Sequence, residues 1–157
     1  MAQRKEFKLL AADIDGTLLN SRGVLTAKTL ESIVQLILSG KHFILSTGRP
    51  LIGARAISKQ IPFDIPIIGG NGAIVATSRS NTIIFRRDLS ADVAHEVIKI
   101  AEEYNASLVI WCQDELFINR KDKYTEKYGS QASSPPQLLA DLSLIYTKDI
   151  TKIIWFD

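Results

Sequence analysis

The chain has 157 residues and a net charge of +2, and 46% of its residues are apolar. That length suits one ordinary domain, or one domain plus part of another. The small net charge gives no argument for nucleic-acid binding, and no apolar run approaches the roughly 20 residues that span a bilayer. A lone cysteine, Cys112, leaves no internal disulfide. We therefore expect a cytoplasmic protein whose partners are neither nucleic acid nor membrane.

The first half of the sequence alternates short apolar runs with helical patterns, which predicts βαβ units and a parallel sheet. The first predicted helix has apolar residues at helical spacing, with Thr26 as its N-cap and Gly40 just past its end. In chain order, the predicted elements are a buried strand at Phe7–Ala12, a helix at Thr26–Ser39, a strand at His42–Leu45, a helix at Leu51–Lys59 and a strand at Ile65–Ile68.

The regular alternation of strands and helices stops in the second half, where a hairpin is followed by a mixture of helices and strands. These elements are a hairpin of Ala73–Ala76 and Thr82–Arg86, a helix from the N-cap Ser90 to Asn105, strands at Leu108–Cys112 and Leu116–Asn119, a charged helix at Lys121–Tyr128 and a strand at Ile150–Phe156. We predict the α/β class. Residues 1–86 form part of a doubly wound, Rossmann-like parallel sheet, and residues 87–157 form a separate α+β unit.

Each of the three predicted parallel strands ends in a polar or glycine-rich loop. In an open α/β sheet, ligands bind in the crevice beyond the carboxyl ends of the strands. The three loops are therefore expected to converge on one site. They are Asp13–Thr17, Ser46–Arg49 and Gly69–Gly72.

The pair Asp13 and Asp15 carries the sharpest chemical signal. Two carboxylates two residues apart at a strand end can face the same side, and like charges that close favour a bound cation. Carboxylate oxygens are ligands that Mg²⁺ prefers, and an aspartate can also act as a nucleophile that forms an aspartyl-phosphate. Gly16 allows the tight turn that follows. The alternative is an acidic turn at the strand end, in which an aspartate only caps the backbone of the turn. The Gly-Thr-Leu that follows favours the functional interpretation.

These motifs resemble those of the haloacid dehalogenase-like superfamily, and within it the Cof-type sugar-phosphate phosphatases. Asp13–Leu19 is similar to the first motif of that family, and Ser46–Pro50 to the second in its Cof-type form. Asn71–Ala73 is similar to the Asn-Gly-Ala run that precedes the cap. The resemblance implies that residues 1–86 are the N-terminal part of a catalytic core and residues 87–157 an incomplete α+β cap domain.

The resemblance also implies a role for each residue. Asp13 would be the nucleophile and Asp15 the general acid and base, and both would hold Mg²⁺. The substrate would be a small phosphorylated metabolite. An ion pair remains an alternative role for the arginine of the second loop, and a turn position remains one for the asparagine of the third. The implied phosphate-binding residues are Gly16, Thr17, Thr47, Gly48, Arg49 and Asn71.

The sequence departs from the family pattern downstream. A lysine motif and a second acidic motif that the family carries after its cap are not found before Asp157. We therefore expect a truncated form of a longer protein, with weak or no activity, whose nucleophile strand lies at an open sheet edge and supports self-association. Three alternatives stay open, namely a phosphomutase of the same superfamily, a receiver-type phosphoacceptor domain and a non-catalytic phosphate-binding or regulatory protein.

Overall fold

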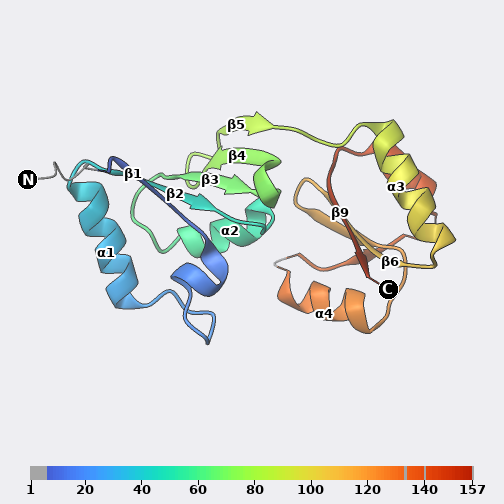
Figure 1. Ribbon diagram of the computed structural model, residues 1–157, viewed down its shortest axis with the longest axis horizontal. Coiled ribbons are helices and arrows are strands. Elements are labelled where there is room, and N and C mark those ends of the chain that lie inside the picture. The colour runs from blue at the N-terminus through green and yellow to red at the C-terminus, as the bar shows by residue number, and fades with distance from the viewer. Residues whose placement is uncertain (1–6, 133, 140, 157) are drawn as a thin grey trace, which may run out of the picture. The chain divides into compact units, whose positions relative to one another are not determined.

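The computed structural model describes residues 7–132, 134–139 and 141–156. The chain divides into two compact units, the first made of residues 1–49 and 54–85 and the second of residues 50–53 and 86–157 (Figure 1). Both predicted domain ranges include positions outside the described residues, namely 1–6, 133, 140 and 157.

The first sheet is mixed, in the order β1-β2-β3-β4-β5. Strand β2 pairs in parallel with both β1 and β3, and β4 runs antiparallel to β3, which confirms the predicted parallel core. Thr26 caps the first helix through a hydrogen bond from the Thr29 N–H, as predicted. The elements are β1 (Leu9–Ala12), the turn η1 (Ile14–Leu18), α1 (Ala27–Leu38), β2 (His42–Ser46), α2 (Leu51–Ser58), β3 (Pro66–Gly69), the turn η2 (Gly70–Gly72), β4 (Ile74–Thr77) and β5 (Ile83–Arg86).

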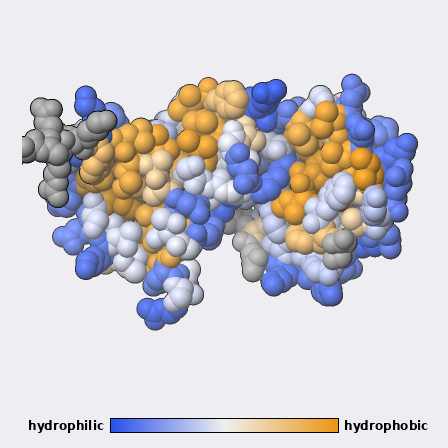
Figure 2. Space-filling view, in the orientation of Figure 1, coloured by the Kyte–Doolittle hydropathy of each residue, from blue (hydrophilic) through white to orange (hydrophobic). Residues whose placement is uncertain are grey.

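The predicted burial of the first strand is wrong. Of the four residues in β1, only Ala12 is buried, while Leu9 and Leu10 are 49% and 42% exposed. The reason is that β1 lies at the end of the sheet and pairs with β2 alone among the described strands. Figure 2 shows hydrophobic residues at the surface of the first unit. The open-edge position expected from the sequence is confirmed.

The second unit has a four-stranded sheet in the order β8-β7-β6-β9. Ser90 caps its first helix through the Val93 N–H, as predicted. The two-residue strand β8 was not predicted, because so short a segment carries no periodicity. The elements are α3 (Ala91–Glu103), β6 (Ser107–Cys112), β7 (Glu115–Ile118), α4 (Lys123–Gln131), β8 (Gln137–Leu138), the turn η3 (Leu142–Thr147) and β9 (Ile150–Phe156).

The core of the second unit lies on both faces of β6. One cluster of buried residues includes Leu108 and Ile110 with residues of α3, and a second includes Val109 and Trp111 with residues of β7. Among the described residues, none of the helices combines the length and the apolar character needed to cross a bilayer.

Candidate active site

The carboxyl ends of three neighbouring strands meet at one edge of the first sheet. β1, β2 and β3 are parallel to one another, so the loops that follow them emerge on the same side. The loop after β2 is tied to β3, because the Thr47 N–H donates to the Ile68 carbonyl at 2.9 Å. Parallel pairing therefore brings the three sequence motifs to a common edge.

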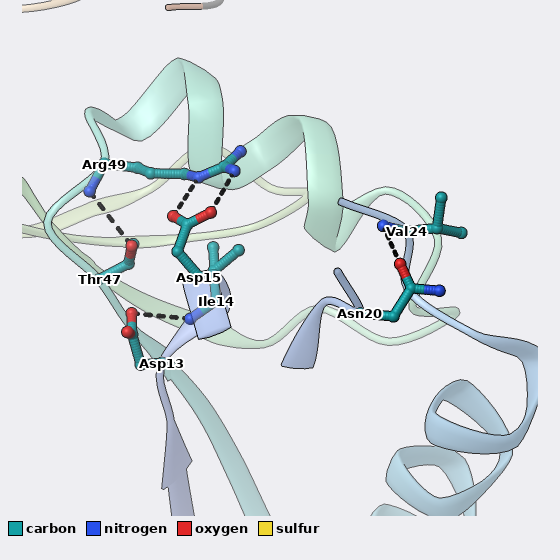
Figure 3. A network of polar contacts seen from close by, with 7 residues as sticks. All are labelled: Asp13, Ile14, Asp15, Asn20, Val24, Thr47 and Arg49. Atoms are coloured by element: carbon teal, nitrogen blue, oxygen red, sulfur yellow. Dashed lines mark hydrogen bonds and ion pairs between the residues drawn. The ribbon is translucent and has the colours of Figure 1, made fainter. Parts of the chain in front are cut away.

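The turn after β1 presents its two aspartates outward. Ile14 is fully buried, whereas Asp13 and Asp15 on either side of it are exposed. The Asp13 carboxylate accepts a hydrogen bond from the Ile14 N–H at 2.7 Å (Figure 3). Gly16 has φ +71°, a left-handed conformation that favours glycine. Thr17 lies next to it on the exposed part of the turn.

The loop after β2 is held by hydrogen bonds of its own. Thr47 is 6% exposed, and its hydroxyl accepts a hydrogen bond from the Arg49 N–H at 3.2 Å. Gly48 is exposed and lies against the Asn71 side chain, since a Cβ built on it would lie 3.3 Å from Asn71 Nδ2. A larger residue at position 48 would therefore force the asparagine to shift.

The turn after β3 is joined to the loop after β2 by two backbone hydrogen bonds. The Gly70 N–H donates to the Arg49 carbonyl at 2.8 Å, and the Asn71 N–H donates to the Thr47 carbonyl at 3.3 Å. Asn71 itself has φ +59°, the left-handed conformation that asparagine tolerates better than most residues. Asn71 therefore occupies a turn position and also lies beside the second loop.

The best-defined polar contact of the site joins the first loop to the second. Arg49 Nε donates to Asp15 Oδ2 at 2.7 Å, and Nη2 donates to Oδ1 at 2.6 Å, which is a bidentate ion pair (Figure 3). These hydrogen bonds and the adjacent positive charge hold the pKa of Asp15 below its ordinary value. The ion pair that the sequence left as an alternative for Arg49 is therefore present.

Asn20 organises the end of the first loop and was not singled out from the sequence. Its Oδ1 accepts hydrogen bonds from the Arg22 N–H at 3.0 Å and the Val24 N–H at 3.1 Å. Gly23, with φ +71°, completes this turn. The run Asn-Ser-Arg-Gly could have indicated this turn, because asparagine side chains commonly form hydrogen bonds with the backbone of a following turn.

The donor set fits a partial magnesium site. Asp13 offers an exposed carboxylate, and Asp15 offers a main-chain carbonyl, since its own carboxylate oxygens both face Arg49. The part of the chain that the structure describes contains no cluster of three or more acidic, histidine or cysteine side chains able to hold a metal. Mg²⁺ is commonly bound by one or two carboxylates with water and substrate phosphate oxygens, and this set is compatible with that pattern.

A family model described as haloacid dehalogenase-like hydrolase matches residues 10–157. The chain belongs to this family. The phosphatase YitU of Bacillus subtilis (strain 168), named 5-amino-6-(5-phospho-D-ribitylamino)uracil phosphatase, is 32% identical over 103 residues, which is 65% of this chain and 38% of the relative. An HMP-PP phosphatase of Yersinia pestis (strain Pestoides F) is 29% identical over 116 residues, 74% of this chain and 42% of the relative.

The chain spans less than half the length of either of these relatives. A solved structure of a haloacid dehalogenase-like hydrolase from B. subtilis matches with a TM-score of 0.82 at 17% identity, covering 96% of this chain and 62% of that one. At this identity the likeness shows a shared fold. It confirms the predicted α/β, Rossmann-like class.

Proposed function

We propose that this chain carries the nucleophile of a magnesium-dependent phosphatase that acts on a small phosphorylated metabolite through an aspartyl-phosphate intermediate. The observation that carries the proposal is the exposure of Asp13 and Asp15 at the carboxyl end of a parallel strand, beside the Thr47–Arg49 loop. The two relatives are both named phosphatases, and the name of the Bacillus protein describes a small phosphorylated compound, which supports the reaction and the substrate class.

Asp13 and Asp15 divide the chemistry between them. Asp13 attacks the phosphorus of the ester, the bond to the leaving oxygen breaks, and Asp15, which must be protonated for this step, gives that oxygen its proton. Water then attacks the aspartyl-phosphate while Asp15 takes up a proton from it. The bond between Asp13 and phosphorus breaks, and inorganic phosphate leaves. A phosphomutase would share the first step but return the phosphoryl group to a substrate.

The three loops supply groups that bind phosphoryl oxygens. Thr47 contributes its hydroxyl, and the exposed Gly48 contributes a backbone close to the ligand. Gly16 and Thr17 are exposed in the first loop and supply further groups from there, and two further side chains are polar donors suited to an anion. These two are Arg49 and Asn71.

Asp13, through its carboxylate, and Asp15, through its main-chain carbonyl, would hold the magnesium ion. When bound, the ion neutralises charge on the transferring phosphoryl group. Because the described residues provide so few acidic ligands, we expect weak or no turnover from these 157 residues. In this proposal residues 1–86 are part of the catalytic core of a cytoplasmic phosphatase, and residues 87–157 are a partial cap.

Phosphorylation of Asp13 tests the proposal without requiring full turnover. The chain is incubated with acetyl phosphate and Mg²⁺, quenched in acid, and its peptides are measured by mass spectrometry. We expect a phosphoryl group on the peptide that contains Asp13, none in Asp13→Asn, and a longer-lived adduct in Asp15→Asn because the base for hydrolysis is removed. Glu31→Gln, which changes an exposed acid of α1, is the matched control and should behave as wild type.

Two further measurements separate the alternatives. The folded chain could bind inorganic phosphate and yet form no adduct at Asp13. That result would contradict the proposed phosphatase activity and favour a non-catalytic phosphate-binding protein. With a sugar phosphate as the substrate, an isomerised phosphorylated product in place of inorganic phosphate would identify a mutase.

A further inference from the structure

One edge of the planar Arg49 guanidinium donates both of its hydrogen bonds to a single carboxylate, that of Asp15. Nε and Nη2 donate to the two Asp15 oxygens at 2.7 and 2.6 Å. The side chains are 30% exposed for Arg49 and 57% exposed for Asp15. The pair therefore lies where a dissolved anion can reach it.

The backbone of Arg49 is anchored beside the hydroxyl proposed to bind phosphate. Its N–H donates to Thr47 Oγ1 at 3.2 Å, and its carbonyl accepts from the Gly70 N–H at 2.8 Å. These two contacts hold the main chain on either side of the Arg49 Cα. If Arg49 changes its hydrogen-bond partner, the side chain therefore moves while the main chain stays in place.

A bound phosphate group would compete with Asp15 for the Nε and Nη2 donors of Arg49. Arginine presents parallel N–H donors whose spacing matches the oxygens of a carboxylate and equally those of a phosphate. One edge of the guanidinium cannot serve both acceptors in bidentate fashion. Ion pairs as exposed as this one are held weakly, so a more highly charged anion bound next to Thr47 would displace the carboxylate.

We propose that Arg49 is exchanged between two partners, Asp15 in the free protein and the phosphoryl group when substrate is bound. This inference rests on the proposed function, because it takes a phosphoryl group as the ligand. Arg49 is then a positioning residue for Asp15. It holds the carboxylate while the site is free of substrate, and it releases the carboxylate when the leaving oxygen has arrived.

Proton–nitrogen correlation spectra of the full chain, labelled at arginine, follow the exchange directly. Arg49→Lys identifies the Arg49 Nε–H signal by its loss. Before phosphate is added, we expect this signal to differ between wild type and Asp15→Asn, because only wild type has the bidentate carboxylate. Saturating inorganic phosphate should then move both signals toward a common position, whereas sodium chloride at equal ionic strength should not.

Calorimetry on the same samples supplies the affinity and separates the two proposals. Asp15→Asn should bind inorganic phosphate up to about fivefold more tightly than wild type, because no carboxylate has to be displaced, while Glu31→Gln should stay within about twofold. A wild-type Arg49 signal that stays in place while phosphate saturates the protein would overturn the exchange and leave the proposed function standing. An absence of phosphate binding in wild type and in Asp15→Asn would overturn the phosphate site itself, and the exchange with it.

Discussion

Strands β1 and β6 are both built mainly from apolar residues, yet only β6 is buried. All six residues of Ser107–Cys112 are buried, whereas only one of the four residues of Leu9–Ala12 is. The difference lies in their neighbours. β6 is paired on both sides, with β7 and β9, and its two faces belong to two separate hydrophobic clusters. β1 is paired only with β2 among the described strands.

One of these strands stabilises its unit, and the other leads into the candidate active site. β6 contributes buried area, and the free energy of unfolding of its unit depends on it. β1 contributes the exposed acidic turn at its carboxyl end, and its Leu9 and Leu10 side chains remain in contact with water. Similar apolar composition thus serves two purposes, and three experiments can sharpen or break that contrast.

The largest effect is expected at the centre of β6. Ile110→Ala should lower the free energy of unfolding of the second unit by about 2–5 kcal/mol, because Ile110 is fully buried and the change leaves a cavity. Leu10→Ala in β1 is the matched control and should cost less than about 1.5 kcal/mol, because that side chain is 42% exposed. Urea denaturation followed by circular dichroism measures both. Equal losses would show that the two strands do not differ as described.

A change at the open edge of β1 should alter self-association. Leu10→Lys places a charge on an exposed edge strand, which is a common way for proteins to block strand pairing between chains. Light scattering over a range of concentrations should show the wild-type mass rising above the 17.4 kDa monomer while the variant stays near it. Lys28→Gln on the exposed face of α1 serves as the control and should associate like wild type. A wild-type protein that remains monomeric throughout would contradict pairing through this edge.

The smallest effect is expected from the ion pair beyond β1. At pH 7, Arg49→Gln should lower the free energy of unfolding by no more than about 1 kcal/mol, because Asp15 is 57% exposed and solvent screens the pair. The folded-state pKa of Asp15 is lowered, so the stability from the pair is present above the unfolded-state pKa of about 3.9 and is lost as the pH falls below it through the folded-state pKa.

Urea titrations at pH 7 and below pH 4 check this dependence. The difference in unfolding free energy between wild type and Arg49→Gln should shrink at the lower pH. A difference that grew on acidification would mean that Arg49 stabilises the fold through contacts other than Asp15.

Much of the local structure of both units could be predicted from local patterns. The N-caps Thr26 and Ser90 were found because a hydroxyl residue just before an apolar-periodic segment is a local signal. The loops of the candidate site were found because polar residues follow the apolar runs directly. The exposure of β1 could not be read in the same way, since an apolar run has the same appearance whether or not a second strand covers it.

Residue order alone was enough to predict the α/β class, the succession of the main strands and helices, and the acidic turn at Asp13–Thr17. These are local properties of spacing, capping and turn chemistry. The tertiary structure decided that most of β1 is exposed and which partner Arg49 takes. Arg49 and Asp15 are 34 residues apart in the chain, and only the parallel pairing of β1 with β2 brings their loops together. Contacts of that kind depend on register and sheet order, which no local pattern contains.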